Sequence, residues 1–487
     1  MAGPGFSGVL RLTDLNDFIG PSQECIKPVL IDKSASSGGT VQISYDDGGY
    51  SEVTASGTKM KLKPAQITLN DCLACSGCVT SAETVLIQQQ SAQQLLDVLE
   101  KKRKASESLS SIVPLVIVSI SPQSRASLAA KYQMSALEIF ERVTGFLTEM
   151  GVDYVFDTTF SRHLTLHVEQ QEFVDRMRER SSGGTAQLPM LASSCPGWIC
   201  YAEKSHGDWI LPRISSVRSP QAIMGVLVKD YLGGKLGKRP DEIFHVTVMP
   251  CFDKKLEASR SDFVFPGTDV REVDCVISTA ELDELISSRV DSLAVAPRIS
   301  PDTRWFPALD KDGHPVVHSG GGSGGYAETV FRYAAASLFN VESPEIKYTV
   351  VRNKDFRELA LIQDKSVVLR VAQCHGFRNI QNFVQKLRRG RSNYDYIEVM
   401  ACPSGCLNGG GQIRPDNVEE KNDLFESVSE KYEELCSLDA STLEDHLRRL
   451  VHDWFGEEGL SSERARRLLR TQYHAVEKSS LSLGIKW

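Results

Sequence analysis

Val-Pro-Leu-Val-Ile-Val-Ser-Ile, residues 113–120, is a short and almost continuous apolar run. This pattern is typical of a parallel strand that is buried on both faces of its sheet. Working outward from it, similar runs occupy residues 245–249, 274–277, 347–352, 366–372 and 396–400. Helical stretches lie between them, at residues 131–150, 220–232, 279–288, 326–339 and 376–389. The alternation predicts an α/β fold with parallel sheets flanked by helices.

The composition sets limits on the class of protein. The chain has 487 residues, of which 41% are hydrophobic and 24% charged, so it can bury a sizeable core. Its net charge of -8 argues against a nucleic-acid partner, because phosphate binding needs a basic face. No apolar run approaches the ~18 residues of a membrane helix, and the N-terminus lacks the pattern of a secretory signal. We therefore expect no membrane partner and a reducing compartment, where clustered cysteines more often bind metals than form disulfides.

A first cysteine cluster has two successive x2 spacings, in Cys72-Leu-Ala-Cys75-Ser-Gly-Cys78. Three thiolates at this spacing can wrap one face of a cubane iron–sulfur cluster, as in bacterial-type ferredoxins. The fourth cysteine of those ferredoxins is missing, and Cys25 is the nearest candidate. The Ser- and Gly-rich residues 33–58, expected to form a mobile surface loop, would let the N-terminal segment fold back. A structural zinc site and free thiols remain alternatives, although zinc sites usually pair two C-x2-C elements.

A second set of cysteines follows three predicted strands. Cys195 follows Leu-Pro-Met-Leu-Ala, Cys251 follows residues 245–249, and Cys402 and Cys406 follow residues 396–400. Ligands of parallel α/β folds bind beyond the carboxyl ends of the strands, so the four thiols can meet at one site. The glycines of residues 408–412 would let the backbone approach a bulky inorganic group. The remaining cysteines are expected to be small buried hydrophobic residues: Cys200, Cys275, Cys374 and Cys436.

The three strand-end segments resemble the signature motifs of iron-only hydrogenases, in their order and with similar spacing. The resemblance extends over most of residues 113–475 and includes residues 156–160 and the glycine-rich residues 319–325. It implies an iron-only-hydrogenase-like fold of two lobes with parallel sheets. It also implies that a four-iron cluster is held by Cys195, Cys251, Cys402 and Cys406, the last with the capacity to bridge to a two-iron unit. The glycine-rich loop is expected to shape the floor of this pocket, and the alternative is a simple turn.

Two positions near these motifs bear on chemistry. Lys254 matches a lysine that donates hydrogen bonds to the two-iron unit of the hydrogenases, and the alternative is a surface lysine. Ser194 stands where true hydrogenases usually have a second cysteine, the proton relay to that unit. A hydroxyl has a pKa far above that of a thiol, which makes it a poorer proton shuttle at neutral pH. We therefore expect cluster binding without hydrogen turnover, so not an enzyme, and an active iron-only hydrogenase or related redox enzyme is the alternative.

Residues 12–28 resemble the N-terminus of the eukaryotic hydrogenase-like factors of cytosolic iron–sulfur protein assembly, the nuclear prelamin A recognition factor-like family. Together with the second cysteine set, this resemblance covers nearly the whole chain. It implies two [4Fe-4S] clusters, the first held by Cys25, Cys72, Cys75 and Cys78. It also implies partners in the early scaffold and the late targeting complex of cytosolic assembly, and a place in the cytoplasm, with the nucleus as a second compartment. A protein whose clusters are purely structural, and which acts as a docking adaptor, is a further alternative.

The last residue of the sequence, Trp487, resembles the terminal tryptophan by which clients and adaptors dock on the targeting complex. An indole with a free carboxylate suits such a role, and the alternative is a tail packed on its own domain. Lys101–Lys104 is either a solvated helix end or a nuclear-import patch. We divide the chain into an N-terminal ferredoxin-like iron–sulfur module at 1–105, the two-lobed core at 106–415, a helical C-terminal region at 416–478 and a tail at 479–487.

Overall fold

The computed structural model describes residues 89–107, 113–310, 312–415, 420–437 and 440–475, together with five short strands nearer the N-terminus. The chain divides into two compact units, Met1–Thr84 and Val85–Trp487. In the first unit, β1 (Val9–Leu10) pairs with β5 (Ile67–Thr68), and the two strands are antiparallel to each other. A second antiparallel sheet contains β2 (Thr40–Ile43), β3 (Tyr50–Val53) and β4 (Lys59–Lys61).

The expected surface loop at residues 33–58 is wrong in part, because β2 and β3 lie inside it. Their sequences, Thr-Val-Gln-Ile and Tyr-Ser-Glu-Val, carry the β-branched and aromatic residues that strands favour. The Ser- and Gly-rich stretches flank these strands and lie outside the described residues. Hairpin pairing in this unit is therefore compatible with its composition.

The first sheet of the second unit has four parallel strands in the order β10-β9-β6-β7. They are β10 (Cys275–Ser278), β9 (Ile243–Met249), β6 (Leu115–Ile120) and β7 (Tyr154–Asp157). Successive side chains of β6 point to opposite faces, so Val116 and Val118 enter one core and Ile117 enters another. Burial on both faces explains why the sequence of this strand is apolar apart from Ser119.

The second sheet has five strands in the order β12-β13-β14-β15-β8. They are β12 (Thr349–Asn353), β13 (Phe356–Gln363), β14 (Ser366–His375), β15 (Tyr396–Met400) and β8 (Met190–Ala192). β14, β15 and β8 are parallel, whereas β12, β13 and β14 pair antiparallel. The prediction of parallel sheets therefore holds for β14, β15 and β8. It fails for β12 and β13, at one edge of this sheet.

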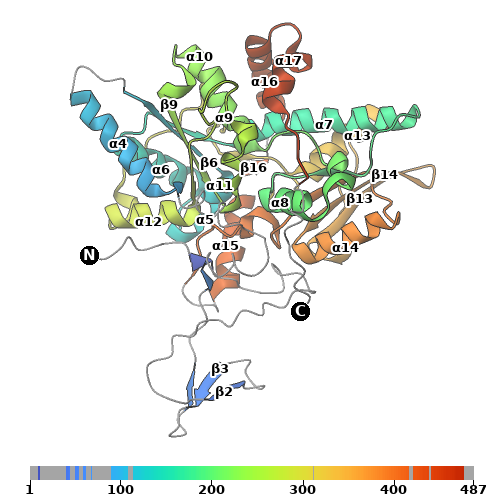
Figure 1. Cartoon of the computed structure of the whole chain (residues 1–487), viewed down its shortest axis with the longest axis horizontal. Coiled ribbons are helices and arrows are strands. Elements are labelled where there is room, and N and C mark those ends of the chain that lie inside the picture. The colour runs from blue at the N-terminus through green and yellow to red at the C-terminus, as the bar shows by residue number, and fades with distance from the viewer. Residues whose placement is uncertain are drawn as a thin grey trace, which may run out of the picture. The chain divides into compact units, whose positions relative to one another are not determined.

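Helices cover both sheets (Figure 1). One face of the first sheet packs on α4 (Ala92–Glu107), α5 (Pro122–Tyr132), α6 (Ala136–Glu149) and α12 (Thr279–Arg289). Its other face packs on α7 (Thr159–Ser181), α9 (Pro220–Val226), α16 (Ala440–Phe455) and α17 (Glu463–Leu469). The second sheet packs on α7, α8 (Pro196–Ser205), α13 (Tyr326–Phe339) and α14 (Phe377–Arg388). Two further helices are α11 (Asp253–Ala258) and α15 (Lys421–Glu433). In the described parts of the chain, no helix is long and apolar enough to cross a membrane.

The structure places two domain boundaries differently from the sequence analysis. The expected boundary at residue 105 falls within α4, whose Leu95 and Leu99 are buried in the core of the first sheet, so the second unit begins at Val85. The expected C-terminal region at 416–478 is not a separate unit, because α15 packs on α5 and α16 on α7. Amphipathic helices at both ends of the core thus complete it instead of forming domains of their own.

Candidate metal centre

The second cysteine set lies at the carboxyl ends of strands from both sheets. Cys195 is the N-cap residue of α8, directly after β8, and Cys251 follows β9. Cys402 follows β15, and Cys406 lies in the short 3-10 helix η7 (Gly405–Asn408). The structure therefore brings four thiols from three distant segments to one place, as the strand-end pattern predicts.

Electrostatic coupling confirms that the four thiols are neighbours. Burial raises the pKa of Cys251 well above its ordinary value, and Asp253, Cys195 and Cys402 raise it further. Burial likewise raises the pKa of Cys195 to about 12, with contributions from Asp253 and Cys406. Four free thiolates are unfavourable in this site. They become stable when a cation or a metal group neutralises their charge.

The backbone around the thiols is held by contacts with neighbouring segments. The amide of Ala401 donates to Sγ of Cys195 at 3.5 Å. The amide of Cys406 donates to Oγ of Ser323 at 3.1 Å. Ser323 belongs to the glycine-rich segment 319–325, so this contact confirms that the segment borders the site.

Glycines let one loop pack directly on a ligand. A Cβ at Gly411 would lie 3.1 Å from Cα and 3.2 Å from N of Cys251, whereas a Cβ at Gly410 would meet nothing within 4 Å. The amide of Gly411 donates to the carbonyl of Pro250 at 2.8 Å. The close approach at Gly411 is therefore required by packing against Cys251, and Gly410 has no such role.

The residues present fit an iron–sulfur cluster. Four sulfur ligands are the donor set of a [4Fe-4S] cluster, and each of these thiols is free of any disulfide. Within the described ranges, no group of three or more His, Cys, Asp or Glu side chains that could hold a metal ion is found.

Lys254 is buried behind the thiols, with only 7% of its surface exposed, so the alternative of a surface lysine is wrong. Its Nζ donates to both carboxylate oxygens of Glu257 at 3.0 Å and to Oγ of Ser219 at 3.1 Å. Burial raises the pKa of Cys251 and Cys406, and the positive charge of Lys254 opposes that rise for both thiols. Lys254 therefore sits where it can stabilise negative charge on two ligands.

Ser194 is buried beside the first ligand. Its hydroxyl donates to Sδ of Met400 at 3.9 Å, a weak contact with a poor acceptor. It also lies within hydrogen-bonding contact of Tyr326, whose pKa burial raises well above its usual value. The groups next to Ser194 are thus a thioether and a neutral phenol, neither of which moves a proton readily at neutral pH.

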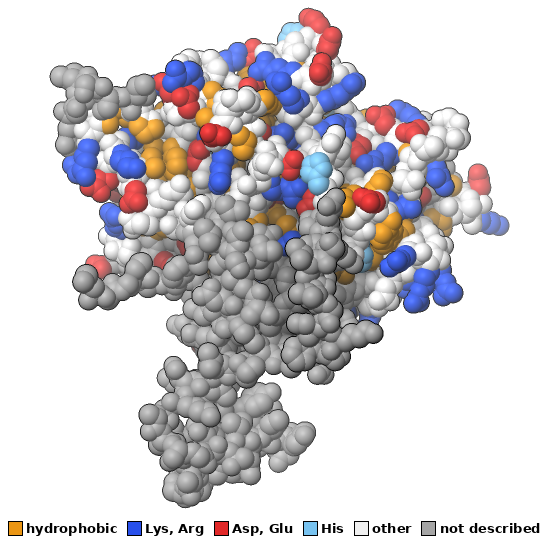
Figure 2. Space-filling model, viewed as in Figure 1, with side chains coloured by type: hydrophobic (Ala, Val, Ile, Leu, Met, Phe, Trp, Pro, Cys, Tyr) orange, Lys and Arg blue, Asp and Glu red, His pale blue; other side chains and the backbone are white. Residues whose placement is uncertain are grey.

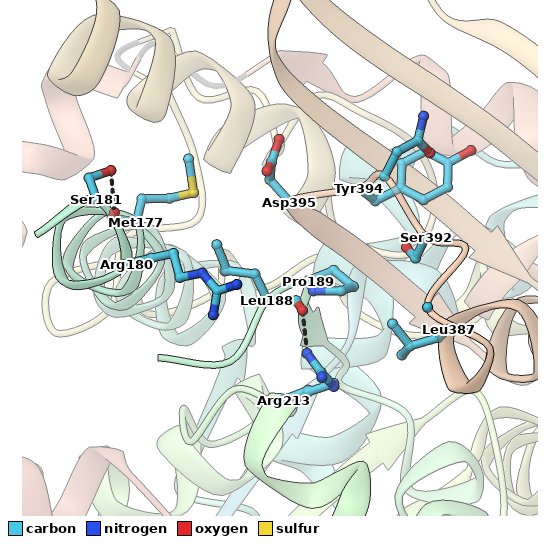
Figure 3. Close-up of a pocket in the computed structure, with 12 residues that line it drawn as sticks. Met177, Arg180, Ser181, Leu188, Pro189, Arg213, Leu387, Ser392, Tyr394 and Asp395 are labelled. Atoms are coloured by element: carbon cyan, nitrogen blue, oxygen red, sulfur yellow. Dashed lines mark hydrogen bonds between the residues drawn. The ribbon is translucent and has the colours of Figure 1, made fainter. Parts of the chain in front are cut away.

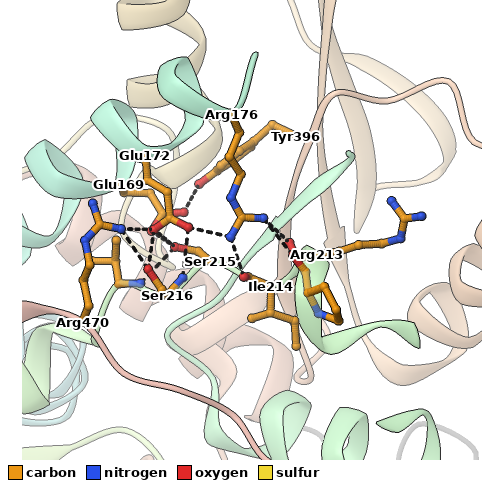
Figure 4. A network of polar contacts seen from close by, with 11 residues as sticks. Glu169, Glu172, Arg176, Arg213, Ile214, Ser215, Ser216, Tyr396 and Arg470 are labelled. Carbon is orange, nitrogen blue, oxygen red and sulfur yellow. Dashed lines mark hydrogen bonds and ion pairs between the residues drawn. The ribbon is translucent and has the colours of Figure 1, made fainter. Parts of the chain in front are cut away.

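A buried polar network lies between α7 and the segment that follows α17 (Figure 4). Ser215 donates to Glu169 at 2.7 Å and to Glu172 at 3.3 Å, which joins the two carboxyl groups. Burial, and then the charge of Glu172, raises the pKa of Glu169 to about 8. Glu172 is neutralised from two directions, by Arg176 at 2.6 Å and Arg470 at 2.8 Å. The pair with Arg470 holds the segment that follows α17 on α7.

Sequence reasoning missed two residues of the site. Asp253 is an electrostatic neighbour of Cys195, Cys251 and Cys402, and only its position two residues after Cys251 could have indicated it. Arg414 donates to Oδ1 of Asn408 at 2.7 Å and to the carbonyl oxygens of Asn408 and Gly409, which fixes the loop that covers Cys251. No sequence signal singles out Arg414, because its contacts arise only in the fold.

The other predicted residues fall into two groups. Cys275 and Cys374 are fully buried, as expected for small hydrophobic residues, and burial raises the pKa of the partly exposed Cys200 to about 12. The side chain of Cys436 and the candidates of the first cluster and the tail lie outside the described residues: Cys25, Cys72, Cys75, Cys78 and Trp487. Their roles stay predictions.

Comparison with known proteins agrees with this geometry. The family described as "Iron only hydrogenase large subunit, C-terminal domain" matches residues 115–410. Cytosolic iron-sulfur assembly component 3 of Rattus norvegicus is 50% identical over 489 residues, covering 100% of both chains. Cytosolic Fe-S cluster assembly factor narfl of Xenopus tropicalis is 51% identical over 483 residues, covering 99% of both.

Solved hydrogenases share the architecture. A structure of a [FeFe]-hydrogenase, from work on its inactivation by oxygen, has a TM-score of 0.67 at 27% identity and covers 79% of this chain and 98% of its own. A variant of [FeFe]-hydrogenase HydA1 from Chlamydomonas reinhardtii has a TM-score of 0.66 at 27% identity, with the same coverage. The similarity to these structures is of fold, and the full-length similarity is to assembly factors.

Proposed function

The chain belongs to the iron-only hydrogenase family and, within it, to the cytosolic iron–sulfur cluster assembly factors, and from this premise we propose how its sites serve that assembly. The observation that carries the proposal is the convergence of Cys195, Cys251, Cys402 and Cys406, the first buried and the other three partly buried, which suits stable cluster retention. In this proposal these four hold one [4Fe-4S] cluster. Cys25, Cys72, Cys75 and Cys78 hold a second, more exposed and more oxygen-sensitive one.

In the proposed pathway the protein links the early scaffold to the late targeting complex in the cytosol, with the nucleus as a second location. A cluster supplies electron-accepting and sulfur-bridging chemistry when bound, and the residues described here supply enclosure. Lys254 places positive charge beside two ligands, and Arg414 keeps the covering loop in place. Trp487 is the proposed docking residue for the targeting complex, since an indole and a carboxylate provide an apolar anchor and an anion.

Cells depleted of the endogenous protein test this function. We expect the intact chain to restore the activity of cytosolic iron–sulfur enzymes, and the Cys251→Ala variant to fail. A chain without Trp487 should keep its iron but bind the targeting complex less well in a pull-down. If the Cys251→Ala variant restores activity fully, the cluster is dispensable for the function. If removal of Trp487 leaves the pull-down unchanged, the docking role is wrong.

We also propose that the protein does not turn over hydrogen. Ser194 supports this, because its neighbours Met400 and Tyr326 provide no relay of suitable pKa. Anaerobically prepared protein with reduced viologen should evolve no more hydrogen than buffer with free iron and sulfide. Turnover above that background, abolished by Cys406→Ala, would instead support the alternative of an active hydrogenase.

A further inference from the structure

A cavity of about 450 Å³ opens on the side of the second sheet where β8 and β15 begin, so it lies at the opposite strand ends from the cysteines. Its walls come from four segments: the last turn of α7, residues 188–189, Arg213, and the turn after α14. Figure 3 shows Arg180 reaching across this space toward Leu188, with Ser392 and Tyr394 on the other wall. Its volume falls in the range of ligand pockets.

The cavity contains two guanidinium groups. Burial lowers the pKa of Arg213, and the positive charge of Arg180 lowers it further, so the two cations are close neighbours. Nη1 of Arg213 donates to the carbonyl of Leu188, while its Nε is buried without a hydrogen-bond partner. Among the described residues, neither arginine forms an ion pair with a carboxylate. Two cations without a carboxylate partner favour an anion beside them.

The remaining polar groups of the wall define what the anion is. Oγ of Ser392 is buried without a hydrogen-bond partner, so it does not face the open space of the cavity. Asp395 is the carboxylate of the lining, but its Oδ2 already accepts from the amide of Arg370 at 2.8 Å. Tyr394 is also occupied, because its hydroxyl donates to Glu358 at 2.8 Å. The guanidinium groups of Arg180, which is exposed, and of Arg213 therefore remain as the cations of the cavity wall.

The other walls are apolar, formed by Met177, Leu188, Pro189 and Leu387. Such walls cannot hydrate the outer oxygens of a phosphate, whereas a carboxylate needs only two or three donors. They also leave room for an apolar side chain next to the carboxylate. The cavity is therefore suited to an acidic group attached to an apolar body.

A basic rim extends the site beyond the cavity. Lys386, Arg388, Arg389 and Arg391 are all exposed around the turn that follows α14. On the face shown in Figure 2, Lys and Arg side chains gather over this part of the second lobe. The chain has a net charge of -8, so this cationic surface differs from the charge of the whole protein. The cationic surface is also wider than a small molecule.

We infer that the cavity between α7, residues 188–189 and the turn after α14 binds an acidic segment of a partner protein, with an apolar side chain in the cavity and carboxylates on Arg180 and Arg213. The occupant is a protein because the exposed cations of the rim extend beyond the cavity. Their positive charge is complementary to acidic side chains of that protein. The inference rests on the proposed function only in making that partner a component of the assembly pathway. Cysteines and clusters take no part in it.

Binding of a fluorescein-labelled peptide, Glu-Asp-Phe-Asp-Glu, to the full chain tests this site by anisotropy. Arg180→Gln with Arg213→Gln should weaken binding at least about tenfold, because charge-assisted hydrogen bonds are lost. Arg448→Gln removes the same charge from an exposed position on α16 and should change binding less than about twofold. Arg180→Gln alone, at an exposed residue, covers the case in which the double variant does not fold.

Two further peptides distinguish the cavity from general attraction. A peptide with Ser in place of Phe should bind at least about tenfold more weakly, because the apolar walls lose their contact. A peptide with Gln and Asn in place of the acids should not bind. Equal binding of the Ser peptide, or an equal effect of Arg448→Gln, would overturn the inference and leave only rim electrostatics. We expect unchanged iron content in all these variants, so a failure here is distinct from a failure of the assembly function.

Discussion

A chain that carries Cys251→Ala should lose about half of its iron, from about eight irons to about four, because one of two [4Fe-4S] clusters loses a ligand. Burial raises the pKa of the other three thiols of this site, which disfavours their thiolate forms. We therefore expect that three thiols alone do not retain the cluster. Iron and sulfide analysis of anaerobically purified protein measures the loss.

Cys275→Ala is the matched control for this variant. Cys275 is fully buried in β10, in register with β9, and is remote in function from the four ligands. The same loss of a buried sulfur should leave about eight irons in place. About eight irons in both variants would show that Cys251 is not a ligand. The same loss of iron in both variants would show that the substitution acts through the core of the sheet.

Lys254→Met should be among the most destabilising single changes near the site, by about 3–5 kcal/mol. The substitution leaves the carboxylate of Glu257 buried, with its two bonds to Nζ at 3.0 Å removed. The side chains of this pair are 9% and 10% exposed, so water cannot replace the lost partner. Thermal unfolding under anaerobic conditions should show a midpoint lower by several degrees.

Two variants separate the loss of an ion pair from the loss of a neighbour of the cluster. Lys235→Met breaks an exposed pair with Asp453, where the side chains are 40% and 44% exposed, and should cost about 0–1 kcal/mol. Lys254→Met with Glu257→Leu removes both charges and should recover most of the stability. If Lys254 also stabilises the ligands, this double variant will still release iron to a chelator faster than the wild-type chain. An unchanged release rate would limit Lys254 to a structural role.

Much of the core was predictable because its strands are buried on both faces. Residues 113–120, 245–249 and 396–400 coincide with β6, β9 and β15, and the predicted helix at 279–288 with α12, whose N-cap Ser278 forms a capping box with Glu281. Apolar runs of this length have few other structures available to them.

Other elements were hidden by their surroundings. α7 was missed because Arg162, Glu169 and Glu172 are buried on it, which interrupts the apolar periodicity of a helix. β13 was missed because the turn to β14 uses Asp364 and Lys365 at φ values of 49° and 64°, without the glycine that usually marks such hairpins. Tertiary contacts, which a local pattern does not contain, determine both elements.

The predicted helix at 131–150 is two helices. Gln133 adopts a left-handed conformation with φ of 53°, which ends α5, and Ser135 caps the start of α6. The convergence of the second cysteine set was predictable because the ends of parallel strands meet at one edge of a sheet. The contacts of Lys254 with Glu257 and of Arg414 with Asn408 were not, because each depends on the side-chain packing around the loop.

The most direct test of the central claim is Mössbauer spectroscopy of the anaerobic protein, combined with iron and sulfide analysis. We predict about eight irons per chain, all in the signature of two [4Fe-4S] clusters, with one cluster lost first on exposure to air. The Cys251→Ala variant should show the signature of the air-sensitive cluster alone. A wild-type spectrum with no four-iron cluster that depends on Cys195, Cys251, Cys402 and Cys406 would contradict the account.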